Sequence, residues 1–349
     1  MKQDKGNLVC QMTSDPRTIE DIGEFGFIRS INKDCIFRSE NVICGIGDDC
    51  AVIGSSGNKA LLVTTDMLVE NVHFILDRIP PQHLGEKSIA VNLSDIAAMG
   101  GVPLHAFVSI AIPHSFPVSL LDALYNGMKA ICQEHGVNVL GGDTSSSPAG
   151  LFISVTVIGE VSRDNILYRK GASRGDKIYV CGLLGRSAAG LAILKGDVAA
   201  DEAEWNGLVE AHTRPRPMVR EGRLIAGSGL ASAMIDVSDG LAADLGHICE
   251  QSGVGAEVEE HKLPISADLR SFGETYGVDT VNLALSGGED YCLLVTVPSE
   301  NAAAFVRQMH KENVSELVEI GKIISGAGVY CIGRDGRKRR VSRGGFHHF

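Results

Sequence analysis

Apolar residues follow two patterns along the chain: short β-branched runs, and longer stretches in which they recur with helical spacing. The short runs predict strands at residues 60–65, 106–112, 137–140, 151–158 and 177–181, and the longer stretches predict helices at 84–99, 120–135 and 188–194. A second set follows, with strands at 231–235 and 291–297 and helices at 241–252 and 300–311. Strands that alternate with helices predict an α/β (α+β) protein.

The length of the chain predicts two domains, because 349 residues exceed the usual size of one. We place the boundary between residues 162 and 163, which gives an N-terminal domain at 18–162 and a C-terminal domain at 163–349. Residues 1–17 are polar and lack the apolar segment of a secretory signal, so we interpret them as a loose extension before a short helix near Gly23. No apolar run reaches the roughly 18 residues that a membrane-spanning helix needs.

The charge balance excludes two classes of partner. Acidic residues outnumber basic ones by 43 to 32, which gives a net charge of −11. A protein that neutralises many nucleic-acid phosphates, or that adheres to an anionic membrane, carries the opposite excess. The nine cysteines are odd in number and form no CxxC pair, which argues against zinc and indicates free thiols in a reducing cytoplasm.

Aspartates follow several of the predicted strands. Asp66, Asp143 and Asp236 each come where an apolar run stops, and Asp239 lies shortly after Asp236. Ligands of open α/β sheets gather at strand ends, and Mg²⁺ prefers carboxylate oxygens there. Any one of these residues could equally be a turn or a helix cap, as Asp239 could be for helix 241–252. Their number favours a metal site.

Two further segments add polar groups. The adjacent acids Asp48 and Asp49 follow a glycine turn, and neighbouring side chains point apart, so we expect one of them to face a site. In the helix at 84–99, Ser88, Asn92 and Asp95 form a nearly uncharged polar stripe, which suits the lining of a cavity better than a solvent-exposed face. Paired glycines at 100–101, 141–142 and 287–288 allow backbone N–H groups to approach phosphates. The sequence contains no Walker A loop and no protein-kinase motif.

A set of segments that includes these residues closely resembles the thiamine-monophosphate kinase family, in order along the chain. They are Gly45–Asp49, Leu62–Phe74, Val91–Gly101, Gly141–Thr144, Met234–Leu241, Ser286–Tyr291 and Gly345–Phe349. The family belongs to the aminoimidazole ribonucleotide synthetase-like ATP-binding superfamily. The resemblance implies two domains, a homodimer joined through the N-terminal sheets, and Mg²⁺-dependent transfer of phosphate from ATP to thiamine monophosphate.

The resemblance also implies roles for individual residues. The Mg²⁺ ligands, for several ions, would be Asp49, Thr64, Thr65, Asp66, Asp95, Asp143, Asp236 and Asp239. The ATP contacts would be Tyr125, Gly142, Asp143, Arg169 and Ser238, and the acceptor contacts would be His73, Glu289 and Phe346. The chain departs from the family at two places: Phe346 stands where Trp is frequent, and Cys50 stands where Thr or Ala is usual.

No residue is expected to act as a general base or covalent nucleophile, because the acceptor phosphate, with a second pKa of about 6, is already ionised at neutral pH. We expect the enzyme to neutralise charge and to align the two phosphates.

Two alternatives stay open at this point. One is another ATP-dependent synthetase of the superfamily, although Cys10 lacks the setting expected of a selenophosphate synthetase. The other is a nucleotide-binding subunit without turnover.

Overall fold

The computed structural model describes residues 17–32, 34–314 and 316–342. By their contacts, these residues fall into two units that divide between Ser39 and Glu40. The smaller unit contains helix α2 (Ile19–Ile31), whose first turn is closed by the backbone N–H of Thr18 donating to Asp21 Oδ2 at 2.6 Å. The helix predicted near Gly23 is therefore present, with a kink at Gly23, where φ is 62°.

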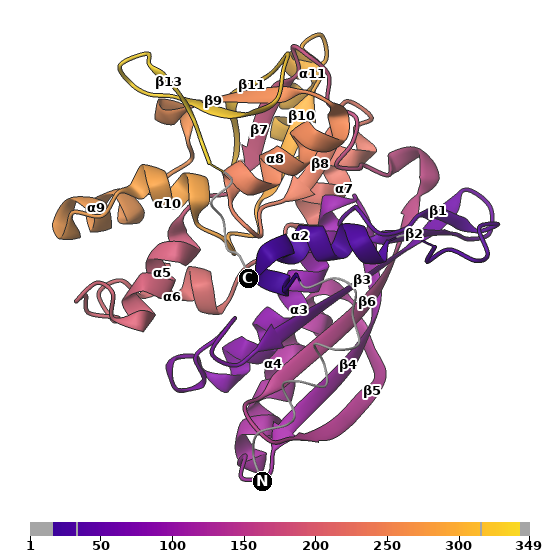
Figure 1. The fold of residues 1–349 in the computed structure, drawn as a ribbon, viewed down its shortest axis with the longest axis vertical. Coiled ribbons are helices and arrows are strands. Elements are labelled where there is room, and N and C mark those ends of the chain that lie inside the picture. The colour runs from indigo at the N-terminus through magenta and orange to yellow at the C-terminus, as the bar shows by residue number, and fades with distance from the viewer. Residues whose placement is uncertain (1–16, 33, 315, 343–349) are drawn as a thin grey trace. The chain divides into compact units, whose positions relative to one another are not determined.

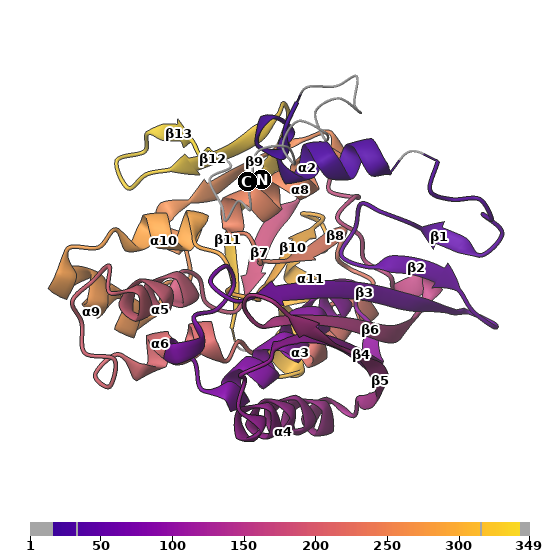
Figure 2. The same ribbon diagram turned by 60° about the horizontal axis from the view of Figure 1, so that its bottom comes forward.

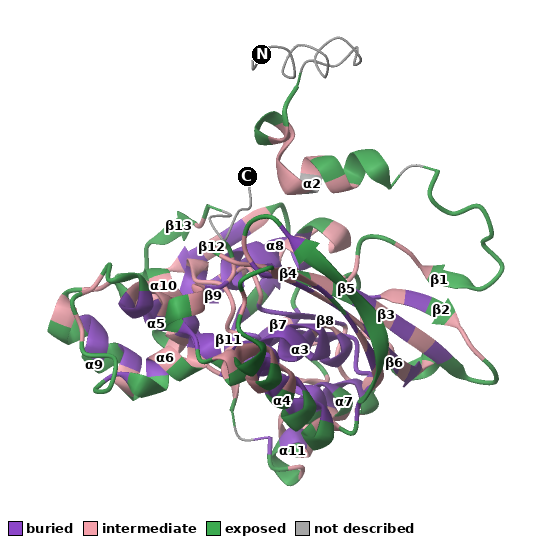
Figure 3. Cartoon of the chain, turned by 90° about the horizontal axis from the view of Figure 1, so that it is seen from below, coloured by how far each residue is buried: buried purple, intermediate pink, exposed green. Residues whose placement is uncertain are grey.

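The larger unit begins with a six-stranded sheet in the order β1-β2-β3-β6-β4-β5. Its strands are β1 (Val42–Cys44), β2 (Ala51–Gly54), β3 (Lys59–Val69), β4 (Val102–Pro113), β5 (Asn138–Ser147) and β6 (Phe152–Ser162). All neighbouring strands pair antiparallel except β4 and β5. Residues of β6 alternate strictly between buried and half-exposed, so the sheet has an inner face against helices and a more open outer face (Figure 3).

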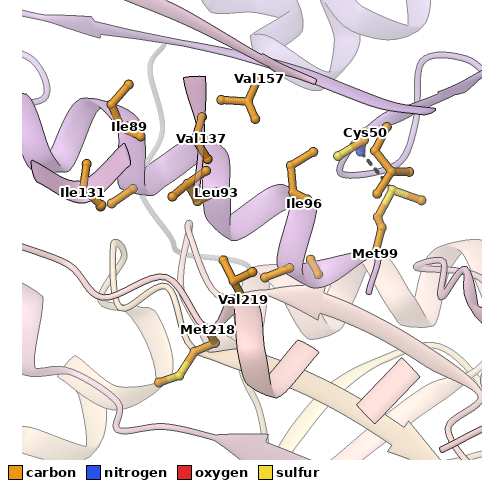
Figure 4. Packing of buried hydrophobic residues seen from close by; sticks show 14 of the residues in the cluster. Cys50, Ile89, Leu93, Ile96, Met99, Ile131, Val137, Val157, Met218 and Val219 are labelled. Atoms are coloured by element: carbon orange, nitrogen blue, oxygen red, sulfur yellow. Dashed lines mark hydrogen bonds between the residues drawn. The ribbon is translucent and has the colours of Figure 1, made fainter. Parts of the chain in front are cut away.

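Helix α3 (Pro81–Ala98) packs on the inner face, and α4 (Val118–His135) packs against α3 (Figure 1). On its other side α3 contacts α7 (Val219–Gly227) and β8 (Ala233–Asp236). Because the sheet lies on one side and these elements on the other, α3 is buried around almost its whole circumference. Ile89, Leu93 and Ile96 point into the apolar core between them (Figure 4).

A second sheet has seven strands in the order β13-β12-β9-β11-β7-β10-β8. The strands not yet given are β7 (Lys177–Cys181), β9 (Gly255–Glu259), β10 (Leu293–Val297), β11 (Leu317–Ile324), β12 (Gly328–Ile332) and β13 (Lys338–Arg340). The remaining helices are α5 (Arg186–Lys195), α6 (Asn206–Thr213), α8 (Leu241–Ser252), α9 (Ala267–Tyr276), α10 (Thr280–Ser286) and α11 (Ala302–Lys311). Short 3₁₀ turns lie at Leu76–Arg78 between β3 and α3, at Arg163–Asn165 after β6, and at Glu260–Lys262 after β9.

The strands β7, β10 and β8 of the second sheet are buried on both faces, which explains their continuous apolar sequences, whereas β13 at the opposite edge is exposed (Figure 2). In β7, Tyr179 and Cys181 belong to the core that includes α3, whereas Ile178 and Val180 belong to a second core with α8. The structure confirms the mixed helix-and-sheet class. The division into domains at residues 162 and 163 stays a prediction.

Two of the strand ends predicted from the sequence were wrong. β3 continues through Asp66 to Val69, and β5 continues through Asp143 to Ser147. Only Asp236 is the last residue of its strand. The polar residues interrupt the apolar pattern in the middle of the strands, and an apolar run alone does not distinguish an end from such an interruption.

Candidate active site

Three aspartates from distant parts of the sequence meet in the larger unit. Asp49 comes from the turn between β1 and β2, Asp95 from the last turns of α3, and Asp236 from the end of β8. One carboxylate oxygen of each lies within 4.8 Å of the others. The side chain of Asp49 is fully buried, and Asp236 is 2 % exposed. Of the adjacent acids Asp48 and Asp49, the structure brings Asp49 into this cluster, and its role as a metal ligand stays a prediction.

Each of the three carboxylates is held by a neighbouring donor. The Thr64 hydroxyl donates to Asp95 Oδ2, and Ser94 Oγ donates to Asp236 Oδ2 at 2.6 Å. Arg169 donates to Asp49 Oδ1 from Nε at 2.9 Å and from Nη2 at 2.5 Å. Asp49 Oδ2 is buried and has no hydrogen-bond partner among the residues that the structure describes. A buried carboxylate oxygen in that condition is costly unless a cation or a donor meets it.

Burial and mutual repulsion disfavour the charged forms of these groups. Burial, followed by the nearby charge of Asp49, raises the pKa of Asp236 to about 7. Burial raises the pKa of Asp49, although Arg169 opposes the change, and it raises the pKa of Asp95 well above its ordinary value, with Asp66 and Asp236 adding to the effect. Burial also raises the pKa of Asp66 to about 6. A bound cation would relieve this repulsion.

The donor set fits Mg²⁺. An ion with oxygen ligands at about 2.1 Å spans oxygens up to about 4.2 Å apart, and the carboxylate oxygens of the cluster all lie within 4.8 Å of one another. The cluster of Asp49, Asp95 and Asp236 offers hard carboxylate oxygens and no sulfur or imidazole donor. Cys50 lies beside it, but burial and four surrounding aspartates raise the pKa of its thiol well above the ordinary value. It therefore stays a neutral thiol and a poor ligand for this metal.

The strand β3 divides its candidate ligands between the two faces of the sheet. Thr64 and Asp66 face inward, toward Asp95. Thr65 is exposed on the outer face, where its hydroxyl donates to the carbonyl of Val155 at 3.2 Å and accepts from Thr156 at 3.0 Å. The structure therefore brings Thr64 and Asp66 toward the cluster, and it does not bring the side chain of Thr65 there.

The candidate ATP contacts on β5 lie apart from the cluster. Successive strand pairings place Asp66 beside Val155, Val155 beside Val108, and Val108 beside Gly142, so Asp66 and Gly142 are separated by two intervening strands. Gly142 has a φ of 151°, and a Cβ there would lie 1.7 Å from the carbonyl oxygen of Val108. Both Gly142 and Asp143 are exposed on this edge strand. Within one chain, Asp143 is not a member of the carboxylate cluster.

The remaining ATP candidates occupy three different environments. Tyr125 is half-buried on α4 and packs against the core. Arg169 pairs with Asp49 as described above, and its backbone N–H also lies 3.3 Å from the Asp48 carboxylate. Ser238 follows β8, and its carbonyl accepts from the N–H of Glu289 at 2.7 Å.

Asp239 lies in a separate group with Asp244 and His247 of α8, whose ligand atoms are within 4.8 Å of one another. Gly240, not Asp239, is the N-cap of α8, and its N–H donates to Asp244 Oδ2 at 3.0 Å. The sequence suggested Asp239 as a cap because it precedes the helix directly, but the left-handed Gly240 intervenes.

The acceptor candidates His73 and Glu289 are linked through one lysine. Lys87 Nζ lies 3.1 Å from the Glu289 carboxylate and 3.4 Å from the carbonyl oxygen of His73. His73 Nδ1 accepts from the N–H of Val69 at 3.0 Å. The third candidate, Phe346, lies outside the described residues. A cavity of about 520 Å³ borders the Glu289 loop at Asp290, but it includes none of the three clustered aspartates.

Comparison with known proteins decides the family. Residues 47–161 match the family described as AIR synthase related protein, N-terminal domain, and residues 173–333 match its C-terminal domain. The thiamine-monophosphate kinase of Aquifex aeolicus is 38% identical over 331 residues, covering 95% of this chain and 99% of the relative. That of Escherichia coli K12 is 36% identical over 94% and 98%. The chain belongs to the thiamine-monophosphate kinase family.

Solved structures agree with membership of the thiamine-monophosphate kinase family. AaThiL complexed with AMPPCP and TMP has a TM-score of 0.83 and 37% identity, and the match covers 97% of this chain and all of that one. Hydrogenase maturation protein HypE of E. coli, at 22% identity and a TM-score of 0.68, shares the fold.

Among the described residues, no helix combines the length and the apolar character needed to cross a bilayer.

Sequence reasoning missed several residues that contact the candidate site residues in this member of the thiamine-monophosphate kinase family. Lys87 was passed over because, next to Glu86, it resembles a surface lysine, and His212 because a lone histidine carries little signal. Ser94 comes one position before Asp95, outside the helical spacing of the polar stripe, and its hydroxyl donates to Asp236. No periodicity in the sequence could reveal that α3 is buried on all sides, which is what turns these polar residues inward.

Proposed function

We propose that this protein phosphorylates thiamine monophosphate to thiamine diphosphate with ATP as the phosphate donor, as a step of thiamine diphosphate biosynthesis. One observation carries the proposal: AaThiL complexed with AMPPCP and TMP matches this chain over 97% of its length with a TM-score of 0.83. The buried cluster of Asp49, Asp95 and Asp236 supports it, because a reaction between two phosphates requires strong compensation of negative charge.

Mg²⁺ is the metal that this site suits. Asp49, Asp95 and Asp236 would hold it, with Thr64 and Asp66 beside them on the inner face of the sheet. When bound, the metal would neutralise charge on the phosphates and help to align them. Asp143, Asp239 and Thr65 lie away from this cluster, so any ion that they hold would be a separate one.

The chain's own residues supply binding and orientation rather than proton transfer. The acceptor phosphate is already a dianion near neutral pH, so no general base is needed. Arg169 offers a guanidinium at the carboxylate cluster, where a phosphate oxygen could take the place of Asp49 as its partner. The buried walls around Asp236, formed by β8 and α3, keep water away from the groups that meet there.

We also propose that the protein is a homodimer joined through the outer face of the first sheet. Nine of the ten residues of β5 are exposed, including Val139 and Leu140, and Met67 of β3 is 55% exposed on the outer face. These exposed apolar side chains and the unpaired edge of β5 are features that a second copy would cover. Light scattering after gel filtration should give a dimer, and Met67→Glu should weaken it. A monomer at micromolar concentration would contradict the proposal.

The decisive assay for the activity is ADP release measured with and without thiamine monophosphate. We expect ADP only in the presence of this acceptor, and little with thiamine itself, which lacks the nucleophilic phosphate. ADP formation that is independent of any added acceptor would favour another ATP-dependent enzyme of the superfamily. No ADP under any condition would favour a nucleotide-binding subunit.

A cytoplasmic location is also part of the proposal. It is suggested by the eight free thiols among the described residues, and cell fractionation tests it.

A further inference from the structure

Lys87 is buried in a way that demands an explanation. Its side chain is 0% exposed, and a lysine is almost never fully buried unless it is paired. Its ammonium group lies 3.1 Å from the carboxylate of Glu289 and 3.4 Å from the carbonyl oxygen of His73. These partners are the two described acceptor candidates. Lys87 and Glu289 are 202 residues apart in the sequence. One side chain of α3 therefore ties both together.

His212 holds the same carboxylate from another direction. Its Nδ1 lies 3.2 Å from Glu289 Oε2 and 3.0 Å from Ser187 Oγ. Burial, and then the charge of Lys87, lower the pKa of His212 to about 3, so the ring is neutral. With its proton on Nδ1, it donates to Glu289 without adding charge. The Glu289 carboxylate thus receives one charged donor from α3 and one neutral donor from α6.

The backbone around Glu289 is held in an unfavourable conformation. Glu289 has a φ of 62° and Tyr291 a φ of 49°, values that side-chain-bearing residues rarely adopt. Hydrogen bonds fix them: the N–H of Glu289 donates to Ser238, and that of Tyr291 donates to Val237 at 2.8 Å. Between them the half-buried Asp290 accepts from the N–H of Gly185 at 2.6 Å. Strain that is maintained by so many contacts is typical of functional sites.

The contacts of this loop lead back to His212. The carboxylate of Asp290 also receives the N–H of Ser187 at 3.3 Å, in the first turn of α5, and the hydroxyl of Ser187 contacts His212. The backbone and the side chain of one serine therefore connect the loop and the histidine that faces it. Hydrogen bonds therefore hold both the main chain of this loop and the carboxylate of Glu289, and the donors come from α3, α5 and α6.

We propose that Lys87 and His212 are positioning residues for the phosphate acceptor, which hold the carboxylate of Glu289 in the orientation that binds thiamine monophosphate. The inference rests on the proposed function and on the acceptor role proposed for Glu289. A carboxylate has about four lone-pair directions. Lys87 Nζ lies 3.1 Å from both oxygens of Glu289, and His212 Nδ1 lies 3.2 Å from Oε2. With these donors fixed, the lone pairs that are left point in set directions, from which they can accept from the amino group of the acceptor's pyrimidine ring. Neither Lys87 nor His212 needs to touch the substrate.

Steady-state kinetics on Lys87→Met and His212→Leu provide the first test, after wild-type turnover of thiamine monophosphate has been established. We expect the KM for thiamine monophosphate to rise by about 10- to 100-fold, the range for loss of a hydrogen bond to a charged group. The KM for ATP should stay within about twofold. Lys177→Met, which breaks a half-exposed lysine–glutamate pair (Lys177–Glu319, 3.0 Å) on the second sheet, is the control for loss of a lysine pair away from the site and should change neither value.

Conservative replacement separates positioning from packing. His212→Asn places an amide N–H close to the position of Nδ1 and should restore most of the acceptor affinity that His212→Leu loses. If both variants have the same KM as the wild type, or if Asn is no better than Leu, the role of His212 is overturned. This pair decides the role of His212 even if Lys87→Met does not fold.

A double-mutant cycle with Glu289→Gln shows whether Lys87 acts through Glu289. If it does, Lys87→Met adds little to the KM once Glu289 is already changed. Fully additive effects would overturn the positioning role, as would a fall in Tm with an unchanged KM. Failure of the proposed function gives a different result, because the wild type itself would then form no ADP with thiamine monophosphate.

Discussion

Replacing Asp236 by asparagine should stabilise the metal-free protein while it destroys activity. The Asp236 side chain is buried, and burial together with Asp49 raises its pKa from the ordinary 3.8 to about 7. Each pKa unit corresponds to about 1.4 kcal/mol, so ionising Asp236 at pH 8 costs the folded state about 4 kcal/mol. Asparagine has the same shape, cannot ionise, and can still accept from Ser94 through its amide oxygen.

The gain in stability should depend on pH in a defined way. The pKa of Asp236 in the folded state lies above that in the unfolded state, so the penalty is absent below about pH 4, grows between about pH 4 and 7, and is complete above about pH 7. Asp236→Asn should therefore gain about 4 kcal/mol at pH 8 and about 1 kcal/mol at pH 4.5. Saturating Mg²⁺ should stabilise the wild type and have much less effect on the variant, because one ligand is lost.

Urea unfolding in EDTA at the two pH values measures these differences. Asp122→Asn, which removes an exposed aspartate of α4, is the control and should change the free energy of unfolding by less than about 0.5 kcal/mol. In the ADP assay, Asp236→Asn should lower kcat by about 100-fold or more. A gain below about 1 kcal/mol at pH 8, or the same gain at both pH values, would refute the view that repulsion among buried carboxylates strains the metal-free site.

Four further predictions concern the same site and its surroundings. Asp66→Asn should lower kcat by about 100-fold or more in a folded protein, because Asp66 shares the inner face with the cluster; near-wild-type ADP formation would remove it from the site. EDTA should stop turnover and Mg²⁺ or Mn²⁺ should restore it, whereas Zn²⁺ should not, and full activity in metal-free buffer would count against the mechanism. Gly142→Ala should lower the Tm by several degrees, since the added Cβ would lie 1.7 Å from the carbonyl oxygen of Val108, and an unchanged Tm would show that β5 shifts freely. Phe346→Ala should raise the KM for thiamine monophosphate about fivefold and leave that for ATP unchanged, because an aromatic contact contributes about 1 kcal/mol; a lower Tm with an unchanged KM would mean that Phe346 only packs.

The sequence was informative where a pattern has one local cause. The helices at 84–99, 120–135 and 241–252 were predicted within a few residues, because their spacing and end signals are local. The antiparallel pairing of β3 with β6 was not predictable, because an apolar strand looks the same in either kind of sheet. The argument from strand ends failed for Asp66 and Asp143 for a different reason, because both interrupt the apolar pattern in the middle of a strand, whereas Asp236 is the last residue of β8.

In the candidate site, too, the sequence predicts local patterns but not contacts between distant segments. The polar stripe of α3 pointed to Asp95, and the structure adds that Ser88 and Asn92 are buried, whereas Asp95 is half-buried. The sequence does not show which distant residues packing brings into contact. Lys87 and Glu289 are joined only because α3 runs between the first sheet and the elements around β8, so that a lysine resembling a surface residue becomes fully buried. Such pairings arise from long-range packing, which leaves no periodic trace.

Phosphorus NMR of a reaction containing the protein, ATP, Mg²⁺ and thiamine monophosphate tests the central claim most directly. The account predicts that thiamine diphosphate and ADP appear in equal amounts, that neither appears when EDTA or Asp236→Asn is used, and that inorganic phosphate does not accumulate. Inorganic phosphate in place of thiamine diphosphate, or unchanged thiamine monophosphate while ATP is consumed, would contradict it.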